Sequence, residues 1–515
     1  MNQDSAQCKR SLVLITVDCL RADHCGWHGY SRPTTPFLDS LASESFVVPQ
    51  AIVAGAPTYY SLPAILASRM PLALGRDVIG VAPGESTLAT VLRESGYATG
   101  AFCAGNPYIS PRFGYDQGFD VFRDFLDFEV QATQDTVNPE TEPGASIRGQ
   151  LNRAIKNLAR AVGLSGLYNE LYFQYCMKIA PAVYSVDALR RFPAADILVD
   201  EAQSWLASVG ERPFFLWLHL MDPHSPYYPP KDAFRELTGR DIEPGRARYL
   251  NEYWKRSDLT PSGFRGKRDE IIELYDAGIR SVDRQIARLV QSLKQTHLWD
   301  DCVLALTADH GEEFLDHGGR YHAPVRLTEE IVRVPLLTRV PRSEGPVVKV
   351  PASPMSHLHL APTLLEIVGV QAPPAFQGRS LWTNLRRGAA WDDPAAVSSI
   401  SPAVGPAIIE CGYDCGNPFR AEDRSAPRLL GVRDSRFKLV MRLEPGATEE
   451  MYDLEADPAE THPSIAGPAL AARRRLLQAA HEHLEKTVTG RDTVMGLRAR
   501  LRDLRCEISS REWRA

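Results

Sequence analysis

The sequence lacks two features that would place it at a membrane or on a nucleic acid. It contains no uninterrupted apolar run of about 18 residues or more, the minimum that a spanning helix needs. It also lacks a basic excess, since its net charge is −6 at pH 7, whereas nucleic-acid binders carry a cationic surface. We therefore expect no transmembrane segment and no nucleic-acid partner.

The cysteines are too unevenly placed to predict a disulfide framework or a compact metal motif. There are nine of them, an odd number, and no two form a Cys-x-x-Cys pair. The first ten residues are polar and lead directly into an apolar segment, so no secretory leader is expected. These features predict a reduced protein located in the cytoplasm.

Short apolar segments alternate with amphipathic segments along much of the 515 residues. The chain is long enough for one large domain and a smaller one. The alternation predicts an α/β sandwich around a mostly parallel sheet. The expected strands are 13–17, 98–103, 213–220 and 302–307, and the expected helices are 35–43, 61–69, 86–95 and 269–298.

The remaining regions do not follow this alternation. We predict a catalytic domain over 8–385 with an insertion at about 127–199, a small α+β domain over 386–487, and an Arg-rich tail over 488–515. In the insertion, apolar residues recur at helical spacing from Ile147 to Val162, among four basic residues. We interpret this segment as a lid or a homo-oligomer helix that packs on the core, with contact to a membrane surface as the alternative.

Two predicted strands that lie far apart in the sequence end on side chains that bind metals. The strand 11–17 is followed by Asp18, and the strand 302–307 by Asp309 and His310. Open α/β folds bind ligands at the carboxyl ends of parallel strands. The sequence therefore predicts a metal or phosphate site at this edge of the sheet.

A hydroxyl group, that of Thr58, precedes a predicted helix start. Ser61 is a suitable N-cap, and Pro63 suits the first turn. Thr58 is therefore expected near free backbone N–H groups and the positive end of a helix dipole, where an anion is stabilised. A threonine in such a place is most often only a turn residue.

Eight sequence segments together carry a family resemblance. The chain resembles the sulfatase branch of the alkaline phosphatase superfamily, in family order from about residue 11 to 485 without the insertion. The resemblance implies an alkaline-phosphatase-like α/β/α sandwich with a small C-terminal α+β subdomain. The matching segments are 17–24, 29–36, 221–227, 307–312, 329–335, 360–365, 378–381 and 451–454.

The chain departs from the formylglycine sulfatases at the nucleophile. Their Cys-x-Pro-Ser-Arg pattern falls on residues 58–62, where Thr58 replaces the cysteine and threonine cannot become formylglycine. The two lysines that hold sulfate in those enzymes are also missing, at 103–106 and near 321–325. An ordinary arylsulfatase is therefore not expected, and the remaining pattern resembles threonine-nucleophile phosphodiesterases and phosphoethanolamine transferases.

The resemblance implies one divalent metal held by Asp18, Thr58, Asp309 and His310. Two carboxylates, an imidazole and an alkoxide suit Zn²⁺ or Mn²⁺, whereas Ca²⁺ prefers oxygen ligands alone. Zn²⁺ or Mn²⁺ is therefore preferred, with Ca²⁺ or Mg²⁺ as alternatives. Asp222 is the residue that a second ion would use.

The resemblance also implies the roles of residues around the substrate. Thr58 is the expected nucleophile, His224 protonates the leaving oxygen, and His322 binds the phosphate or activates water. His322 is assigned by its interval of twelve residues after His310. Asn106 and Tyr60 are expected to contact the substrate.

These residues predict a metal-dependent hydrolase of phosphate monoesters or diesters that acts through a covalent phosphothreonine. The expected partner is a small-molecule phosphate or sulfate ester. Phosphorus is preferred, because water can cleave a phosphothreonine, whereas a sulfothreonine lacks the aldehyde-hydrate route that releases sulfate. The alternatives are a sulfuric ester hydrolase without formylglycine, a phosphoryl transferase to an alcohol, and a catalytically dead scaffold.

Overall fold

The structure is a computed structural model. It describes residues 9–73, 79–127, 147–323, 326–392, 404–412, 428–443, 449–464 and 466–487. The Arg-rich tail expected over 488–515 lies outside the described residues, as does the part of the expected insertion over 128–146.

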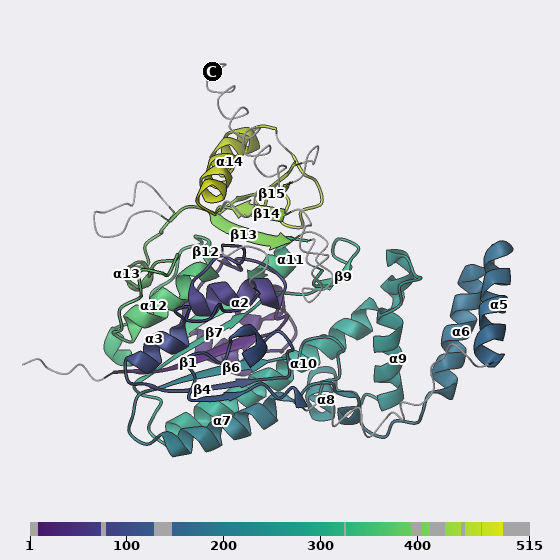
Figure 1. The fold of residues 1–515 in the computed structure, drawn as a ribbon, viewed down its shortest axis with the longest axis horizontal. Coiled ribbons are helices and arrows are strands. Elements are labelled where there is room, and N and C mark those ends of the chain that lie inside the picture. Colours follow the sequence, from purple (N-terminus) through teal and green to yellow (C-terminus); the bar gives the residue numbers. More distant parts are fainter. Residues whose placement is uncertain are drawn as a thin grey trace, which may run out of the picture.

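A seven-stranded sheet forms the centre of the molecule (Figure 1). Its innermost strands are continuous apolar segments and are almost completely buried, as expected for strands covered on both faces. β1 pairs in parallel with β6 and β7, and only β2 and β11 give antiparallel pairings. The strand order is β2 (Phe46–Val47), β11 (Leu336–Arg339), β7 (Cys302–Ala308), β1 (Ser11–Val17), β6 (Phe214–Leu220), β4 (Ala98–Cys103) and β5 (Val121–Arg123).

Helices cover both faces of this sheet, so the predicted α/β sandwich is confirmed (Figure 1). One face carries α7 (Ala195–Val209), α8 (Lys231–Thr238) and α10 (Pro261–Gln295). The other face carries α2 (Thr58–Ala67), α3 (Leu88–Glu94) and α12 (Leu360–Ile367). α1 (Pro36–Ala42) packs against α10.

The start of α2 differs from the sequence prediction. Ser61 is not the N-cap, because the helix begins at Thr58 with Pro57 as the capping residue. The carbonyl of Pro57 accepts hydrogen bonds from the N–H groups of Tyr60 and Ser61, which extends the helix by one turn. Pro63 consequently lies inside the helix. The nucleophile candidate is therefore the first helical residue.

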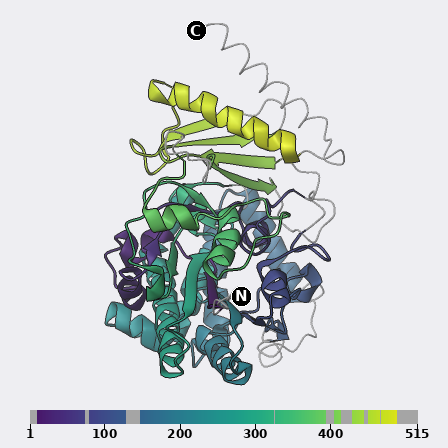
Figure 2. The ribbon, with the colours of Figure 1, turned by 90° about the vertical axis from the view of Figure 1, so that its left-hand side faces the viewer.

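A second, smaller sheet stands above the main body and is covered by one helix (Figure 2). Its four strands are antiparallel neighbours in chain order. This confirms the small C-terminal α+β subdomain. The strands are β13 (Ala407–Gly412), β14 (Arg428–Arg433), β15 (Phe437–Arg442) and β16 (Glu449–Asp453), and the helix is α14 (Pro468–Thr487).

The insertion contains a helical hairpin of α5 (Ile147–Ala161) and α6 (Ser165–Ile179) at one end of the longest axis (Figure 1). The described apolar side chains of α5 are not covered by the core; Leu158, for example, is 64% exposed. The expected packing of α5 on the core is therefore not observed. None of the described helices has the length and apolarity needed to cross a bilayer.

Candidate metal and ester site

The carboxyl ends of β1 and β7 bring the predicted ligands together. Val17 and Ala308 are register partners in the parallel pair, so the residues that follow them, Asp18 and Asp309, emerge side by side. His310 continues the loop after β7. All three side chains have no exposed surface, so strand register and burial position this group.

Three oxygen atoms that could bind a metal lie near one nitrogen of His310. Its Nε2 lies 3.2 Å from Thr58 Oγ1, 3.6 Å from Asp18 Oδ1 and 3.5 Å from Asp309 Oδ2. Ligands at 2.0–2.1 Å around a tetrahedral Zn²⁺ are about 3.3 Å apart. His310 Nδ1 lies 2.9 Å from the carbonyl of Gly311, so it donates there and leaves the lone pair of Nε2 for a metal. The three oxygens therefore lie within reach of an ion bound at His310 Nε2, and Asp18 and Asp309 also form, with His219, a buried group whose ligand atoms lie within 4.8 Å of one another.

The electrostatics of the two carboxylates also favour a cation. Burial and the charge of Asp18 raise the pKa of Asp309. Burial opposes ionisation of Asp18, but His224 and the other nearby imidazoles hold its pKa well below the usual range. Asp309 Oδ2 accepts no hydrogen bond from the described residues. A buried, unpaired carboxylate oxygen beside a second carboxylate is costly without a cation.

Asp18 is held by a hydrogen-bonded chain that the sequence reading missed. Trp217 Nε1 donates to Thr16 Oγ1 over 3.0 Å, and Thr16 Oγ1 lies 2.9 Å from His219 Nδ1. His219 Nε2 then lies 3.4 Å from Asp18 Oδ2. The position of His219 near the end of the apolar strand β6 could have predicted that it reaches the site.

Asn106 lies at the site, in contact with a candidate metal ligand. Its Nδ2 donates to Asp18 Oδ2 over 3.0 Å, and its Oδ1 accepts from the backbone N–H of Tyr108. The side chain is 3% exposed and orients Asp18. Tyr60 is 8% exposed, and its ring lies 4.6 Å from that of Tyr59 at the start of α2.

The two histidines assigned to the substrate lie beside the metal ligands. The ring centroid of His322 is 4.5 Å from that of His310 and 5.2 Å from that of His224. His224 Nδ1 lies 2.5 Å from the carbonyl of Ser225, which leaves Nε2 available, and burial lowers the pKa of His224. Burial also opposes protonation of His322, but Glu312 outweighs it and raises the pKa of His322 to about 9.

Cys19 and Glu312 are further buried members of the site, and neither was predicted. Cys19 Sγ lies 3.1 Å from Asp18 Oδ1 and 3.3 Å from His322 Nδ1. Burial first, and then the charge of Glu312, raises the pKa of Cys19 well above its usual value, so the group is a neutral thiol. Cys19 directly follows the predicted ligand Asp18, and Glu312 lies two residues after the predicted ligand His310. This closeness in the sequence could have indicated that both belong to the site.

Two neighbouring side chains support the loops and do not face the ligands. Arg21 forms ion pairs with Asp23 and Asp316, which joins the loop after β1 to the loop after β7. Asp222 accepts hydrogen bonds from the N–H of Ala195 and the hydroxyl of Ser281. Its carboxylate is thus engaged between α7 and α10, and does not provide the second-ion ligand that the sequence suggested.

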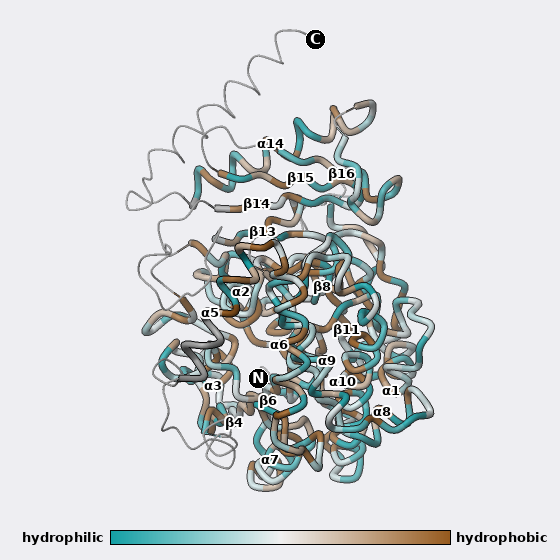
Figure 3. Tube along the Cα trace, turned by 90° about the vertical axis from the view of Figure 1, so that its right-hand side faces the viewer, coloured by the Kyte–Doolittle hydropathy of each residue, from teal (hydrophilic) through white to brown (hydrophobic). Residues whose placement is uncertain are grey.

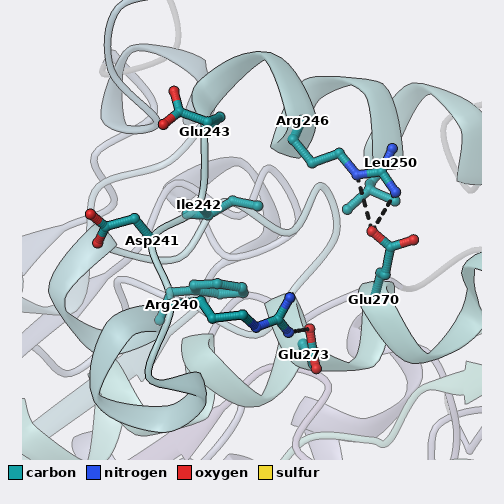
Figure 4. A pocket seen from close by; sticks show the side chains of 9 residues that line it. Arg240, Asp241, Ile242, Glu243, Arg246, Leu250, Glu270 and Glu273 are labelled. Carbon is teal, nitrogen blue, oxygen red and sulfur yellow. Dashed lines mark hydrogen bonds and ion pairs between the residues drawn. The ribbon is translucent and has the colours of Figure 1, made fainter.

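A separate pocket of about 170 Å³ lies between α8, α9 (Pro244–Trp254) and α10 (Figure 4). Both of its arginines are already engaged, since Arg246 pairs with Glu270 and Arg240 with Glu273. It contains no histidine and no nucleophile. The candidate site therefore remains the edge of the central sheet.

The chain matches the protein-family model described as Sulfatase over residues 10–370. It is 26% identical over 288 residues to the arylsulfatase K of Xenopus laevis, an alignment that covers 51% of this chain and 50% of the relative. It is 23% identical over 347 residues to the multifunctional alkaline phosphatase superfamily protein PehA of Trinickia caryophylli. That alignment covers 60% of this chain and 64% of the relative. The chain thus spans about half to two thirds of the length of these relatives.

Solved structures reproduce the fold. The phosphonate monoester hydrolase of Agrobacterium radiobacter superposes with a TM-score of 0.63 at 18% identity, over 93% of this chain and 95% of that protein. At this identity the similarity demonstrates a shared fold and does not transfer the substrate.

Proposed function

The chain belongs to the sulfatase family, and we propose that within it this protein hydrolyses phosphate esters through a covalent phosphothreonine at Thr58. Family membership makes the chain a hydrolase of the alkaline phosphatase superfamily. The observation that carries the finer proposal is the position of Thr58 Oγ1, at the N-terminus of α2 and 3.2 Å from His310 Nε2. A hydroxyl at that place reaches both the metal donors and the helix dipole.

Asp18, Thr58, Asp309 and His310 would hold one divalent ion, with Zn²⁺ or Mn²⁺ preferred because of the imidazole. When bound, this ion supplies the positive charge that lowers the pKa of the Thr58 hydroxyl and neutralises phosphoryl oxygens. Thr58 is the first residue of α2, and the positive end of the helix dipole there favours an anionic group.

The side chains of this site can carry out a double displacement. Deprotonated Thr58 Oγ1 forms a bond to phosphorus while the ester P–O bond breaks, and protonated His224 gives its proton to the departing oxygen. Burial lowers the pKa of His224, so the protonated ring is a strong donor. Water then attacks the phosphothreonine and gives one proton to His224, while the P–O bond to Thr58 breaks and Thr58 leaves as the alkoxide that began the cycle.

His322 supplies positive charge beside His224, whose ring centroid lies 5.2 Å from its own. Its pKa of about 9 makes it an imidazolium at neutral pH, paired with Glu312 over 3.2 Å. Such a group stabilises the negative charge of phosphoryl oxygens. With an alcohol in place of water as acceptor, the same site would act as a phosphoryl transferase, and product analysis with added alcohols distinguishes the two.

A sulfuric ester hydrolase without formylglycine is the second candidate, since several relatives are named sulfatases. Thr58 argues against it, because threonine offers no aldehyde hydrate for the release of sulfate. Aryl phosphate monoesters, diesters and sulfates with one common leaving group should be compared with added Zn²⁺ or Mn²⁺. We expect a higher kcat/KM for a phosphate ester, and a higher value for the sulfate would reverse the assignment.

Acid quenching during turnover tests the nucleophile directly. We expect the peptide containing Thr58 to gain about 80 daltons, the mass of a phosphoryl group that replaces a proton. Thr58→Ala should lose about 10³-fold or more in rate, whereas Thr58→Ser, which keeps the hydroxyl, should retain measurable activity. Near-normal turnover of Thr58→Ala would show that the double displacement is wrong, and inactivity of the unmodified chain toward every ester would favour the dead scaffold.

A further inference from the structure

The large apolar side chains that are exposed on this molecule are concentrated in one segment. Ten of the thirteen found among the described residues lie between residues 155 and 184. They include Leu158, Val162, Leu167 and Leu171, which are 57–64% exposed. A folded chain rarely leaves a contiguous apolar surface of this kind uncovered unless it binds something there.

One face of α6 is already used to attach the hairpin to the body. The ring of Phe173 lies 5.5 Å from that of Tyr249 on α9, and Glu170 forms an ion pair with Arg256. Another side carries Leu167 and Leu171, with Leu164 at the N-cap, at intervals of three and four residues, and no element among the described residues covers these leucines. The hairpin stands at the end of the molecule that faces the viewer in Figure 3.

α5 combines this apolar surface with positive charge. Ile155, Leu158 and Val162 recur at helical spacing, and the exposed Lys156 and Arg160 lie outside that row. The sequence of α5 contains no acidic residue. A helix with low overall hydrophobicity, one apolar side and a basic polar side is typical of the membrane interface.

The hairpin is basic within an acidic chain. Residues 147–184 contain five basic residues and one acidic residue, which gives +4, whereas the whole chain carries −6. The other residues together therefore carry −10. An anionic surface would attract the hairpin and repel the rest of the molecule, so the charge distribution also orients the docking.

We propose that the α5–α6 hairpin docks this protein on an anionic lipid surface. The apolar rows of both helices enter the boundary between headgroups and acyl chains, Lys156 and Arg160 contact lipid phosphates, and the tyrosines of α6 lie at headgroup depth. A second copy of the chain suits the surface less well, because symmetric pairing of two hairpins would bring basic α5 helices together. The attachment is peripheral.

Co-sedimentation of the full-length chain with vesicles tests the proposal. We expect binding to vesicles of phosphatidylcholine with phosphatidylglycerol, weaker binding as salt is raised, and at least about tenfold weaker binding to phosphatidylcholine alone. Lys156→Glu with Arg160→Glu should weaken binding to the anionic vesicles by about tenfold or more.

An apolar-face variant separates insertion from simple charge attraction. Leu158→Glu with Leu171→Glu should abolish vesicle binding, while circular dichroism and the turnover of a soluble ester stay unchanged. Leu470→Glu is the matched control, because Leu470 is an exposed leucine (44%) on α14, outside the hairpin. It should bind as the unmodified chain does.

Three results would overturn the proposal. The first is no binding to either vesicle type, and the second is vesicle binding that Leu158→Glu with Leu171→Glu leaves intact. The third is a dimer detected by light scattering that the same variant dissociates, without vesicle binding, which would identify the face as a contact between copies. None of these results depends on the nucleophile assignment, so the two proposals fail separately.

Discussion

Single residues in this site work through the neighbours that hold them. Asp18 has one oxygen engaged by His219 and Asn106 and the other directed toward His310. Asp309, in contrast, keeps an oxygen that no described residue satisfies. Asp309 is therefore the ligand whose loss should affect the metal most directly.

Asp309→Ala should remove the bound metal and nearly all turnover while the fold is retained, because no described residue donates a hydrogen bond to Asp309 Oδ2. Metal content by plasma mass spectrometry and turnover with a phosphate ester are the two measurements. Asp200→Ala is the control, since Asp200 lies at the surface of α7 with an exposed ion pair to Arg288. Full metal content in Asp309→Ala would mean that the ligand set is wrong.

His317 should make stability depend on pH above neutrality. The hydrogen bond with Glu330 raises the pKa of His317 to about 9, and its other nitrogen lies 2.9 Å from the carbonyl of Ala459. The folded pKa exceeds the ordinary value of 6.5, so the stabilisation is complete below about pH 6.5 and is lost as pH rises through about 9. After a discount for solvent screening, we expect protonated His317 to contribute roughly 1–2 kcal/mol to the free energy of unfolding.

The measurement is the denaturant midpoint between pH 6 and 10 for the unmodified chain and for His317→Gln. The variant should be less stable at low pH and should lose this part of the pH dependence. Parallel curves for the two proteins would show that His317 does not titrate in this range.

At the scale of elements, the site requires helices and loops to approach each other closely. The loop after β6 carries His224, and it lies directly on α10 at Gly278. A Cβ at Gly278 would be 2.5 Å from the carbonyl oxygen of Asp222. The absence of a side chain there lets the long helix support the loop that positions the histidine.

Gly278→Ala should lower the free energy of unfolding by about 1–3 kcal/mol, because the added methyl group overpacks the contact. Turnover should fall as His224 moves. Gly266→Ala is the matched control in the same helix, where a Cβ meets nothing within 4 Å, and it should stabilise by about 0.5–1 kcal/mol. Equal stability of the two variants would contradict the close approach.

At the scale of the whole molecule, buried charges join the small subdomain to the catalytic body. Lys438 on β15 has no exposed surface and forms ion pairs with Glu329, on α11 (Glu329–Val332), and with Glu460. Arg433 also pairs with Glu329. The pKa of Glu329 is about 2, because these cations outweigh the effect of burial. The subdomain thus stabilises the element that follows the site loops.

Lys438→Ala should destabilise the chain by about 3–5 kcal/mol, because it leaves buried carboxylates without their cation. Thermal unfolding by calorimetry measures the loss. Lys255→Ala removes a surface pair with Glu252 and should cost at most about 1 kcal/mol. A small effect of Lys438→Ala would show that water reaches the junction and screens these charges.

The sequence by itself determined the central strands and the residues that end them. The apolar runs before Asp18 and Asp309 predict buried parallel strands, and parallel strands place their carboxyl ends at one edge. The family followed from ordered motifs, which local sequence preserves. The roles given to Thr58, His224 and His322 remain predictions, although the fold does bring these residues to one place.

Only the tertiary structure decided which other side chains join the site. His219 and Cys19 contact Asp18, and Glu312 contacts His322, through strand register and loop geometry. The periodicity of the local sequence predicts neither register nor loop geometry. The turn at Pro57 moved the start of α2 to Thr58 through backbone hydrogen bonds that propensity did not anticipate. The spacing in α5 predicted an apolar side of the helix. Spacing cannot specify what covers that side, because the core of the described chain does not pack against it.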